Sequence, residues 1–454
     1  MALSTVGSGL DVTTIVAQLV AAERKPTETR INTAGTAATA KLSALGSIKS
    51  SLTSLQTALE TFSKSASRPT FKATPAENAG FTAAIATDAT TGKTLATAGT
   101  HNIEVVSLSQ NQKLTSAAFS KDTHIGTGTL TVAYGDKTLS IEVSDKGTLS
   151  DIASAINSAA GGKGVSASVI TADDGQHLVL NAVDSGTKGA ITLSTTGGNG
   201  GLDQLTWDGT SGGLTQTVEP TDAVVKVDGF TRTSSSNTIA DIIPGVTLTV
   251  TKADAGTTKT LTVAQDNTPM KTNLQAFIAA YNATSSMLKS ASAYDATTET
   301  ASVLTGDSMV RGLQQQLRGQ MSANVNQLKA LGVTIGKDGS LAFDSATFDK
   351  AMAADPSSAD ALFGEKGTLT TSMQTMLKSQ LDSTQGTLTQ RTTSLNKQIK
   401  TLEKELDDLD ARMEKVSARY TAQFTAMDTL VAQMQSTSDY LTQQLASLQS
   451  KTSK

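Results

Sequence analysis

The 454-residue chain has no cysteine, which excludes disulfide bonds, thiolate nucleophiles and thiolate metal sites. Aromatic residues make up only 4% of the chain and tryptophan occurs once, so we expect modest hydrophobic cores. The formal net charge is −4 without any basic run, which favours neither nucleic acid nor an anionic membrane surface as a partner. We expect no cleaved signal peptide and no membrane span, because the N-terminus lacks a basic and apolar leader and no apolar run is long enough.

The residue types that carry catalysis are present but not grouped. The three histidines, His101, His124 and His177, lie in separate strand or loop contexts and are predicted to be solvated. Gly7-Ser-Gly9 is a lone glycine-rich turn without the strand and lysine of a phosphate-binding loop. The acidic run between Glu403 and Asp410 is predicted to be the solvated flank of a coiled coil. We therefore expect no enzyme, no catalytic or metal-binding residues and no cofactor.

The C-terminal third carries a long apolar stripe whose spacing alternates four and three, the pattern of a coiled-coil seam. Its members are Leu395, Ile399, Leu402, Leu406, Leu409, Met413, Val416, Tyr420, Phe424, Met427, Val431, Met434, Leu441, Leu445 and Leu448. The alternation is broken once, by two successive steps of four around Tyr420. A helix from Ser383 to the C-terminus would be roughly 95 Å long, so it needs a partner helix along its stripe.

The partner is predicted at the other end of the chain, where Ile31 to Phe62 repeats the spacing, interrupted by Lys49. A shorter helix that Asp11 can cap precedes it, with Val12, Ile15 and Leu19 on its apolar face, and Pro26 is expected to end or kink this helix.

Between about Thr74 and Asp266 the apolar period changes to alternation, which predicts short strands and a single helix at Ser150 to Ser158. The glycine-rich stretch Thr195 to Gly213 is predicted to be a loop or an excursion from the core. Helices return at Met270 to Tyr281 and Val310 to Met321. A hairpin at 333–343 and helical pieces then lead to the C-terminal helix.

The predicted fold class is multidomain α+β, with terminal helices paired as a coiled-coil stalk and helical leg around an inserted β-rich head. The domain boundaries that we expect are 1–40 and 416–454 for the terminal coiled coil, 41–73 and 269–415 for the leg, and 74–268 for one or two head domains, including a motif at 148–194.

Both ends of the chain are almost uncharged: residues 1–22 contain only Asp11, and residues 429–450 contain only Asp439. A free coiled coil normally carries flanking charges, so these ends are suited to docking into another packed helical array. The residues predicted to form the docking seam are Val12, Ile15, Leu19, Tyr420, Phe424, Met427, Met434, Leu441, Leu445 and Leu448.

Several segments together resemble one family, the flagellar hook-associated protein 2 family of bacterial flagellar filament caps. The N-terminal Gly7 to Pro26 is similar to the family's opening, and Asn237 to Leu248, with Asn237, Ile242, Pro244 and Gly245, resembles its most recognisable internal motif. The hairpin from Leu331 to Asp344 and the C-terminal helix around Gln423-Phe424 and Tyr440-Leu441 also match. Thr148 to Ile170 resembles a motif of flagellin and hook-associated proteins.

The resemblance implies a homo-oligomeric ring at the distal end of the filament that promotes flagellin insertion and prevents flagellin leakage. A pentamer is favoured, with a hexamer as the alternative. Implied partners are flagellin, the hook–filament junction proteins, an export chaperone at the C-terminal helix and, in some relatives, host mucin. The implied location is the extracellular tip of the flagellum, reached through the flagellar type III export apparatus. Two alternatives stay open: a flagellin or hook–filament junction protein, which shares paired terminal helices, and a surface adhesin on a coiled-coil stalk.

Overall fold

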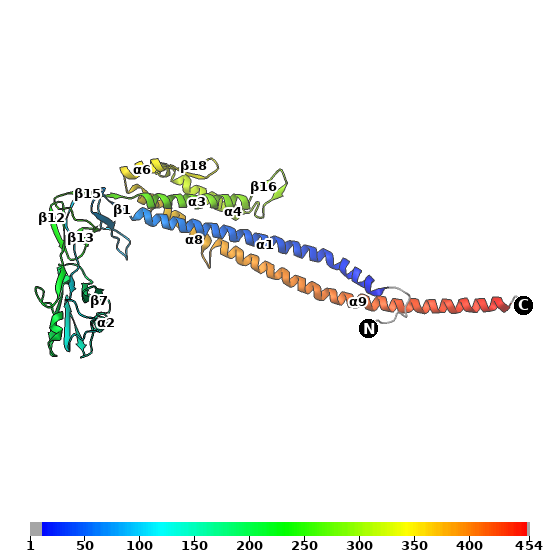
Figure 1. The fold of residues 1–454 in the computed structure, drawn as a ribbon. Helices are drawn as coiled ribbons and strands as arrows, with labels where there is room; N and C mark the ends of the chain where they lie inside the picture. The colour runs from blue at the N-terminus through cyan, green and yellow to red at the C-terminus, as the bar shows by residue number, and fades with distance from the viewer. Residues whose placement is uncertain (1–10, 452–454) are drawn as a thin grey trace. The chain divides into compact units, whose positions relative to one another are not determined.

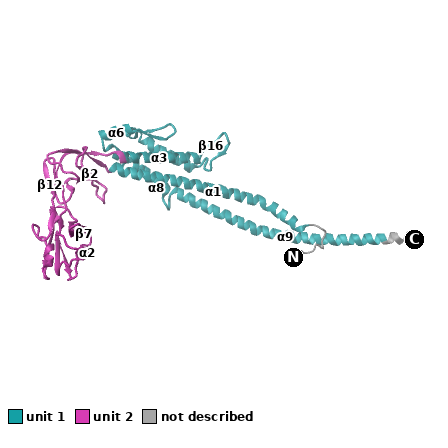
Figure 2. Ribbon diagram, viewed as in Figure 1, with its two compact units in different colours: residues 1–67, 270–454 teal, residues 68–269 magenta. Residues whose placement is uncertain are grey.

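The chain forms two compact units, one inserted into the other. The computed structural model describes the backbone of residues 11–451 and the side chains of residues 11–446. Unit 1 comprises residues 1–67 and 270–454, and unit 2 comprises residues 68–269 (Figure 2). The predicted fold class is thereby confirmed: helices from the two ends of the chain pair with each other, and a β-rich unit lies between them in the sequence. The finer domain boundaries stay predictions.

Two long helices dominate unit 1. They are α1 (Val12–Ser67) and α9 (Thr387–Lys451), which lie side by side over most of the length of α1 (Figure 1). At 1.5 Å per residue, α9 alone is about 98 Å long. The other elements of unit 1 are α3 (Thr268–Ala291), β16 (Tyr294–Asp295), β17 (Thr300–Ala301), α4 (Ser308–Ala323), α5 (Val325–Ala330), β18 (Val333–Ile335), β19 (Leu341–Phe343), α6 (Ser345–Ala354), α7 (Ser358–Phe363) and α8 (Thr368–Leu381).

The leg is the part of unit 1 in which these shorter elements pack on α1 and the start of α9. One hydrophobic core joins them, from Ala38 in α1 to Leu395 in α9. Its centre is an aromatic cluster in which the ring of Phe62 lies 4.6 Å from Phe363 and 6.3 Å from Phe277. Lys49 does not interrupt the buried face of α1, because the fully buried Ile48 occupies that position and Lys49 is exposed.

Two features of unit 1 differ from the sequence-based expectation. Pro26 does not end a helix: α1 continues through it, and its partner α9 contacts α1 on both sides, at Arg24 and Arg30. Pro26 is exposed and removes one backbone hydrogen bond from the helix. The packing of α1 against α9 on both sides of Pro26 outweighs this loss. Helix α8 was not predicted, although Leu369, Met373 and Leu377 give it an apolar face that is fully buried in the leg core.

Unit 2 contains two antiparallel sheet pairs. The first pair has strand orders β1-β15-β3-β11-β12 and β13-β14-β2, and the second has β10-β4-β8-β7 and β6-β5-β9. The strands are β1 (Phe71–Pro75), β2 (Phe81–Ile85), β3 (Gly99–Ser107), β4 (Lys113–Thr115), β5 (Gly128–Tyr134), β6 (Lys137–Val143), β7 (Val165–Ala172), β8 (Gly175–Ala182), β9 (Ile191–Thr196), β10 (Thr215–Val218), β11 (Ala223–Val227), β12 (Phe230–Ser234), β13 (Thr238–Ile243), β14 (Val246–Val250) and β15 (Lys259–Gln265).

Each sheet pair encloses its own core, and the second core also includes α2 (Leu149–Ala160). The helix is bounded as its sequence predicts. Thr148 and Asp151 form a reciprocal capping box at its start, and Gly161 ends it with a φ of 56°, a left-handed conformation that favours glycine.

The expectation for Thr195 to Gly213 was wrong for the segment from Gly201 to Trp207, whereas residues 197–200 and 208–213 are exposed turns, bends and loops. Leu202, Leu205 and Trp207 are at most 6% exposed and belong to the second core of unit 2. A short 3-10 helix, η2 (Gly201–Leu205), places the two leucines, and Trp207 pairs with Leu193 of β9 through two backbone hydrogen bonds. The segment is a core element because of this long-range pairing, which its glycine-rich composition conceals.

Candidate functional site

The candidate site is the stalk, which we define as residues 12–34 of α1 and 402–446 of α9. Two ion pairs across the helices fix their relative direction. Arg30 Nη2 lies 2.9 Å from Glu405 Oε2, and Arg24 Nη1 lies 2.6 Å from Asp410 Oδ1. Because residue numbers fall along α1 while they rise along α9, the helices are antiparallel. The two ends of the chain are therefore each other's partner, as the repeated spacing predicts.

The stalk has a narrow apolar core of its own. Four seam residues of α9 between Leu402 and Val416 are at most 8% exposed. Ile31 of α1, which packs in the same core, is 1% exposed. The buried members are Ile31, Leu402, Leu409, Met413 and Val416, with Val20, Ala34, Leu406 and Tyr420 half-buried around them. This is the two-helix version of a coiled-coil seam.

The acidic run is only partly a solvated flank. The predicted pair within the helix exists, with Lys404 Nζ 2.8 Å from Asp408 Oδ2. However, Glu405 and Asp410 pair across to arginines of α1, as described above, so part of the run holds the two helices in register. Water screens exposed ion pairs, so these pairs direct the pairing of the helices more than they stabilise it.

The N-terminal seam lies on a face displaced from the predicted one. Val12 and Ile15 are half-buried, but Leu19 is 41% exposed, whereas Val16 is 4% exposed. Counting back from Ile31 in steps of four and three through Thr27, Arg24 and Val20 reaches Val16, and all of these side chains are at least half-buried. The polar Thr27 and Arg24 hide this continuation of the seam in the sequence.

The apolar stripe of α9 leaves the core near the break in its spacing. Tyr420 and Phe424 are half-buried, and the Tyr420 hydroxyl donates to Glu23 Oε2 at 3.2 Å. Met427 is already 42% exposed. The break thus coincides with the end of continuous burial, whereas the change from leg core to stalk core lies earlier, between Ile399 and Leu402.

Beyond this point lies what we call the uncovered end of α9, residues 433–446. Every side chain in it is exposed. Four of them are large and apolar: Met434 is 64% exposed, Tyr440 60%, Leu441 54% and Leu445 64%. The side chain of Leu448, another predicted seam residue, lies outside the described residues. An apolar helical stripe that nothing in the described chain covers marks an interaction surface.

The internal motif around Asn237 holds unit 2 together. The side-chain amide of Asn237 donates to the Ser109 carbonyl at 2.9 Å, and its carbonyl oxygen accepts from the Ser109 N–H at 2.8 Å. Ser109 is 5% exposed, so these two bonds satisfy backbone groups that would otherwise be buried unpaired. The motif therefore joins the segment after β3 to the start of β13.

The rest of the motif forms the β13–β14 hairpin. Ile242 packs against the first core of unit 2, and Pro244 and Gly245 form a two-residue turn between the paired Ile243 and Val246. Gly245 has a φ of +72°, and a Cβ added there would lie 2.2 Å from the backbone nitrogen of Ala96. Proline followed by a glycine with positive φ suits a type II turn. These residues shape unit 2, and any direct role in assembly stays a proposal.

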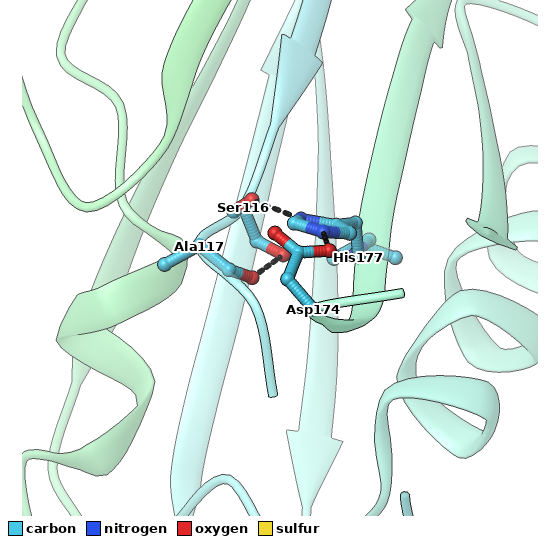
Figure 3. Close-up of polar contacts among 5 residues, drawn as sticks. Ser116, Ala117, Asp174 and His177 are labelled. Carbon is cyan, nitrogen blue, oxygen red and sulfur yellow. Dashed lines mark hydrogen bonds and ion pairs between the residues drawn. The ribbon is translucent and has the colours of Figure 1, made fainter. Parts of the chain in front are cut away.

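His177 on β8 is not simply solvated, because both of its ring nitrogens face acceptors (Figure 3). Nδ1 lies 3.0 Å from the Ser116 carbonyl oxygen, and Nε2 lies 3.0 Å from Asp174 Oδ1. A neutral imidazole has one N–H and can donate to only one of these acceptors, whereas the imidazolium donates to both. The Ser116 carbonyl and then the Asp174 carboxylate raise the pKa of His177, and His177 lowers the pKa of Asp174.

These shifts predict a pH dependence for unit 2. A raised His177 pKa adds stability that is fully present below the ordinary value of 6.5 and is lost as the pH rises through the folded-state pKa. The lowered Asp174 pKa adds stability that is present above 3.8 and is lost as the pH falls through its folded-state pKa. We expect the difference in urea midpoint between wild type and His177→Gln, followed by Trp207 fluorescence, to be larger at pH 5.5 than at pH 8. An equal loss for His177→Gln at both pH values would contradict the charged pair.

Among the described residues, no group of three or more His, Asp or Glu side chains is arranged to hold a metal ion. Within the same part of the chain, no helix is both long enough and apolar enough to cross a membrane.

Comparison with known proteins identifies the family. The model of the flagellar hook-associated protein 2 N-terminus matches residues 8–112, the model of its C-terminus matches residues 220–436, and the flagellin hook IN motif matches residues 129–184. The third match contains the motif expected at Thr148 to Ile170. The stretch Thr195 to Gly213, which supplies three buried side chains, lies outside all three matches, in agreement with its lack of any recognisable pattern.

Individual relatives extend the match over the full chain. The B-type flagellar hook-associated protein 2 of Pseudomonas aeruginosa is 31% identical, over 99% of this chain and 98% of the relative. Flagellar hook-associated protein 2 of Escherichia coli O157:H7 is 35% identical, over 97% of each chain. The crystal structure of the D1-D2-D3 domains of the flagellar cap protein FliD from Escherichia coli superposes with a TM-score of 0.63, at 32% identity, over 78% of this chain and 99% of that one. The resemblance seen in the sequence is confirmed, and the chain belongs to the flagellar hook-associated protein 2 family.

Proposed function

We infer that this chain caps the bacterial flagellar filament. Copies of it form an oligomer at the distal end of the flagellum, promote the insertion of flagellin and keep flagellin from leaking into the medium. The observation that carries this function is the uncovered end of α9, where Met434, Leu441 and Leu445 are more than half exposed on a helix with a single charge between residues 429 and 450. The apolar face of such a segment is suited to packing against other helices, while its polar face can stay in water.

The stalk explains how that end can be presented. The antiparallel pairing with α1 stiffens α9 up to about Phe424, so the uncovered end continues a supported helix. The uncovered end, residues 433–446, is about 21 Å long, enough for several turns of contact with a neighbouring array. We propose that the seam residues Tyr420, Phe424, Met427, Met434, Leu441, Leu445 and Leu448, together with Val12, Ile15 and Leu19, form the filament-docking surface.

The remaining partners are proposals of the same kind. We propose that the ring has five copies, with six as the alternative, and that it contacts flagellin and the hook–filament junction proteins. An export chaperone that covers the uncovered end of α9 would prevent its apolar side chains from associating before secretion, and the absence of cysteine suits passage of an unfolded chain through the type III apparatus. Adhesion to host mucin stays an expectation from the resemblance.

Deleting the gene in the source bacterium tests the function. We expect secreted flagellin to accumulate in the medium while filaments disappear in electron micrographs, and a plasmid copy to restore both. Cryo-electron microscopy of filament tips from the complemented strain should show the oligomer and give its copy number. Normal filaments in the deletion strain together with lost attachment to host surfaces would contradict the cap and support the stalked adhesin.

A further inference from the structure

A cavity of about 160 Å³ opens in the leg, away from the stalk and from the uncovered end of α9. It lies between α3, α4 and the turn that joins β18 to β19. The polar residues that line it are Tyr281, Ser285, Lys289, Gln314, Gln315 and Arg318, and Gly339 of the turn also borders it. No part of the proposed cap function uses this cavity.

Two cations of the lining converge on one neutral acceptor. Lys289 Nζ donates to the backbone carbonyl oxygen of Asp338 at 2.7 Å, and Arg318 Nη2 donates to the same oxygen at 3.2 Å. The carboxylate of Asp338 is turned back into its own loop, where it accepts from the N–H and the hydroxyl of Ser340 at 3.0 and 2.7 Å. Neither cation forms an ion pair within 4.0 Å with a described carboxylate, although the charge of Lys289 adds to the Ser340 hydrogen bonds in lowering the pKa of the Asp338 carboxyl.

Glycine at position 339 allows this arrangement. Gly339 has a φ of +85°, and a Cβ built there would lie 2.9 Å from Arg318 Nη2 and 3.0 Å from Arg318 Nε. The guanidinium therefore lies directly against the backbone of the turn. Its planar fork of N–H groups is held at the cavity with donors to spare, which is the geometry that binds carboxylates.

Tyr281 adds a third donor from the floor of the cavity. Its side chain is 2% exposed, and its hydroxyl has no hydrogen-bond partner among the described residues. Burial raises the pKa of Tyr281, while the nearby Arg318 opposes this effect. The hydroxyl is therefore protonated at neutral pH and can donate a hydrogen bond to a group that enters the cavity.

The size of the cavity limits what can enter. Pockets for cofactors and drug-sized ligands are about 300 to 1,000 Å³, roughly twice this volume or more. One side chain that carries a carboxylate fits, and a carboxylate is the group that two cations without an ion-pair partner and a hydroxyl donor recognise. We propose that this cavity binds the carboxylate of a glutamate or aspartate side chain presented by a protein partner of the leg.

Capped glutamate, N-acetyl-glutamate N-methylamide, is the probe, and capped glutamine is its neutral isostere. In TROSY spectra of the ¹⁵N-labelled full chain, capped glutamate should shift the Gly339 amide saturably, with a dissociation constant on the order of 10 mM. Capped glutamine should not. Arg318→Gln and Lys289→Gln should each weaken the binding at least about tenfold, since each removes a charge-assisted hydrogen bond. Arg311→Gln makes the same charge change on α4 outside the cavity and should leave the affinity within about twofold.

Three results would overturn the proposal. The first is the absence of a saturable shift of the Gly339 amide resonance when capped glutamate is added to about 100 mM. The second is equal binding of capped glutamine, which would show that the charge is not recognised. The third is an equal weakening of capped-glutamate binding by Arg311→Gln. It would show that the affinity depends on the net charge of the surface and not on the cavity. Circular dichroism of each variant checks that the leg is folded, and Lys289→Gln tests the site independently if Arg318→Gln does not fold.

Discussion

Cells that make the Leu441→Lys, Leu445→Lys double variant will export it, shed flagellin into the medium and grow few or no filaments. Both leucines are more than half exposed in the free chain, so the substitutions cost little before assembly. If the uncovered end of α9 docks into a packed helical array, each lysine must be buried without a partner, which costs several kcal/mol. Since 1.4 kcal/mol is a factor of ten in an equilibrium constant, the number of filaments per cell should fall at least about tenfold. Immunoblots of secreted flagellin and counts in electron micrographs measure the effect.

A matched variant separates position from charge. Ser436→Lys with Gln443→Lys adds the same two charges to the same exposed segment, about 160° to 220° around the helix from Leu441 and Leu445. We expect filaments close to normal in number. Unit 2 should fold normally in both variants, because its cores contain no residue of α9. Normal filaments with confirmed secretion of the Leu441, Leu445 variant would show that these residues do not anchor a cap.

Phe62→Ala should destabilise the leg by about 3 to 5 kcal/mol, the usual cost of removing a buried phenylalanine ring and leaving a cavity. Phe62 is 0% exposed and its ring contacts both Phe277 and Phe363, so no single neighbour can fill the space. The helical signal in circular dichroism, which unit 1 dominates, should be lost at a clearly lower urea concentration than in wild type. Trp207, the only tryptophan, lies in the core of unit 2, and its fluorescence transition should stay where it is.

Phe230→Ala is the control for the same chemical change. Phe230 begins β12 and is 78% exposed, so its removal should alter the free energy of unfolding by no more than about 0.5 kcal/mol. A Phe62→Ala variant whose helical transition matched that of Phe230→Ala would contradict the assignment of the aromatic cluster as the centre of the leg.

Most elements of this fold could be predicted from local patterns. The alternating strands, the capped helix α2 and the β18–β19 hairpin follow from side-chain period and turn residues within about ten positions. The family motif also indicates its turn, because a proline followed by a glycine, here Pro244 and Gly245, is typical of turns. The local composition around Trp207 predicts a loop. The burial of Trp207 depends on its pairing with Leu193 of β9, which local composition does not report.

The candidate site shows the same division within a single helix. The amino-acid pattern alone predicts that α9 is one long helix with a continuous apolar stripe and that its partner is the N-terminal helix, because spacing of three and four residues repeats at both ends. It could not determine where the partnership stops, since Leu402 and Leu441 occupy equivalent positions in the pattern, yet one is 8% and the other 54% exposed. The packing of the two helices sets this limit, because α1 pairs in the antiparallel direction and begins at Val12. Periodicity reports that a helix face is apolar, while the length and direction of the neighbouring chain decide which part of that face is left for a partner.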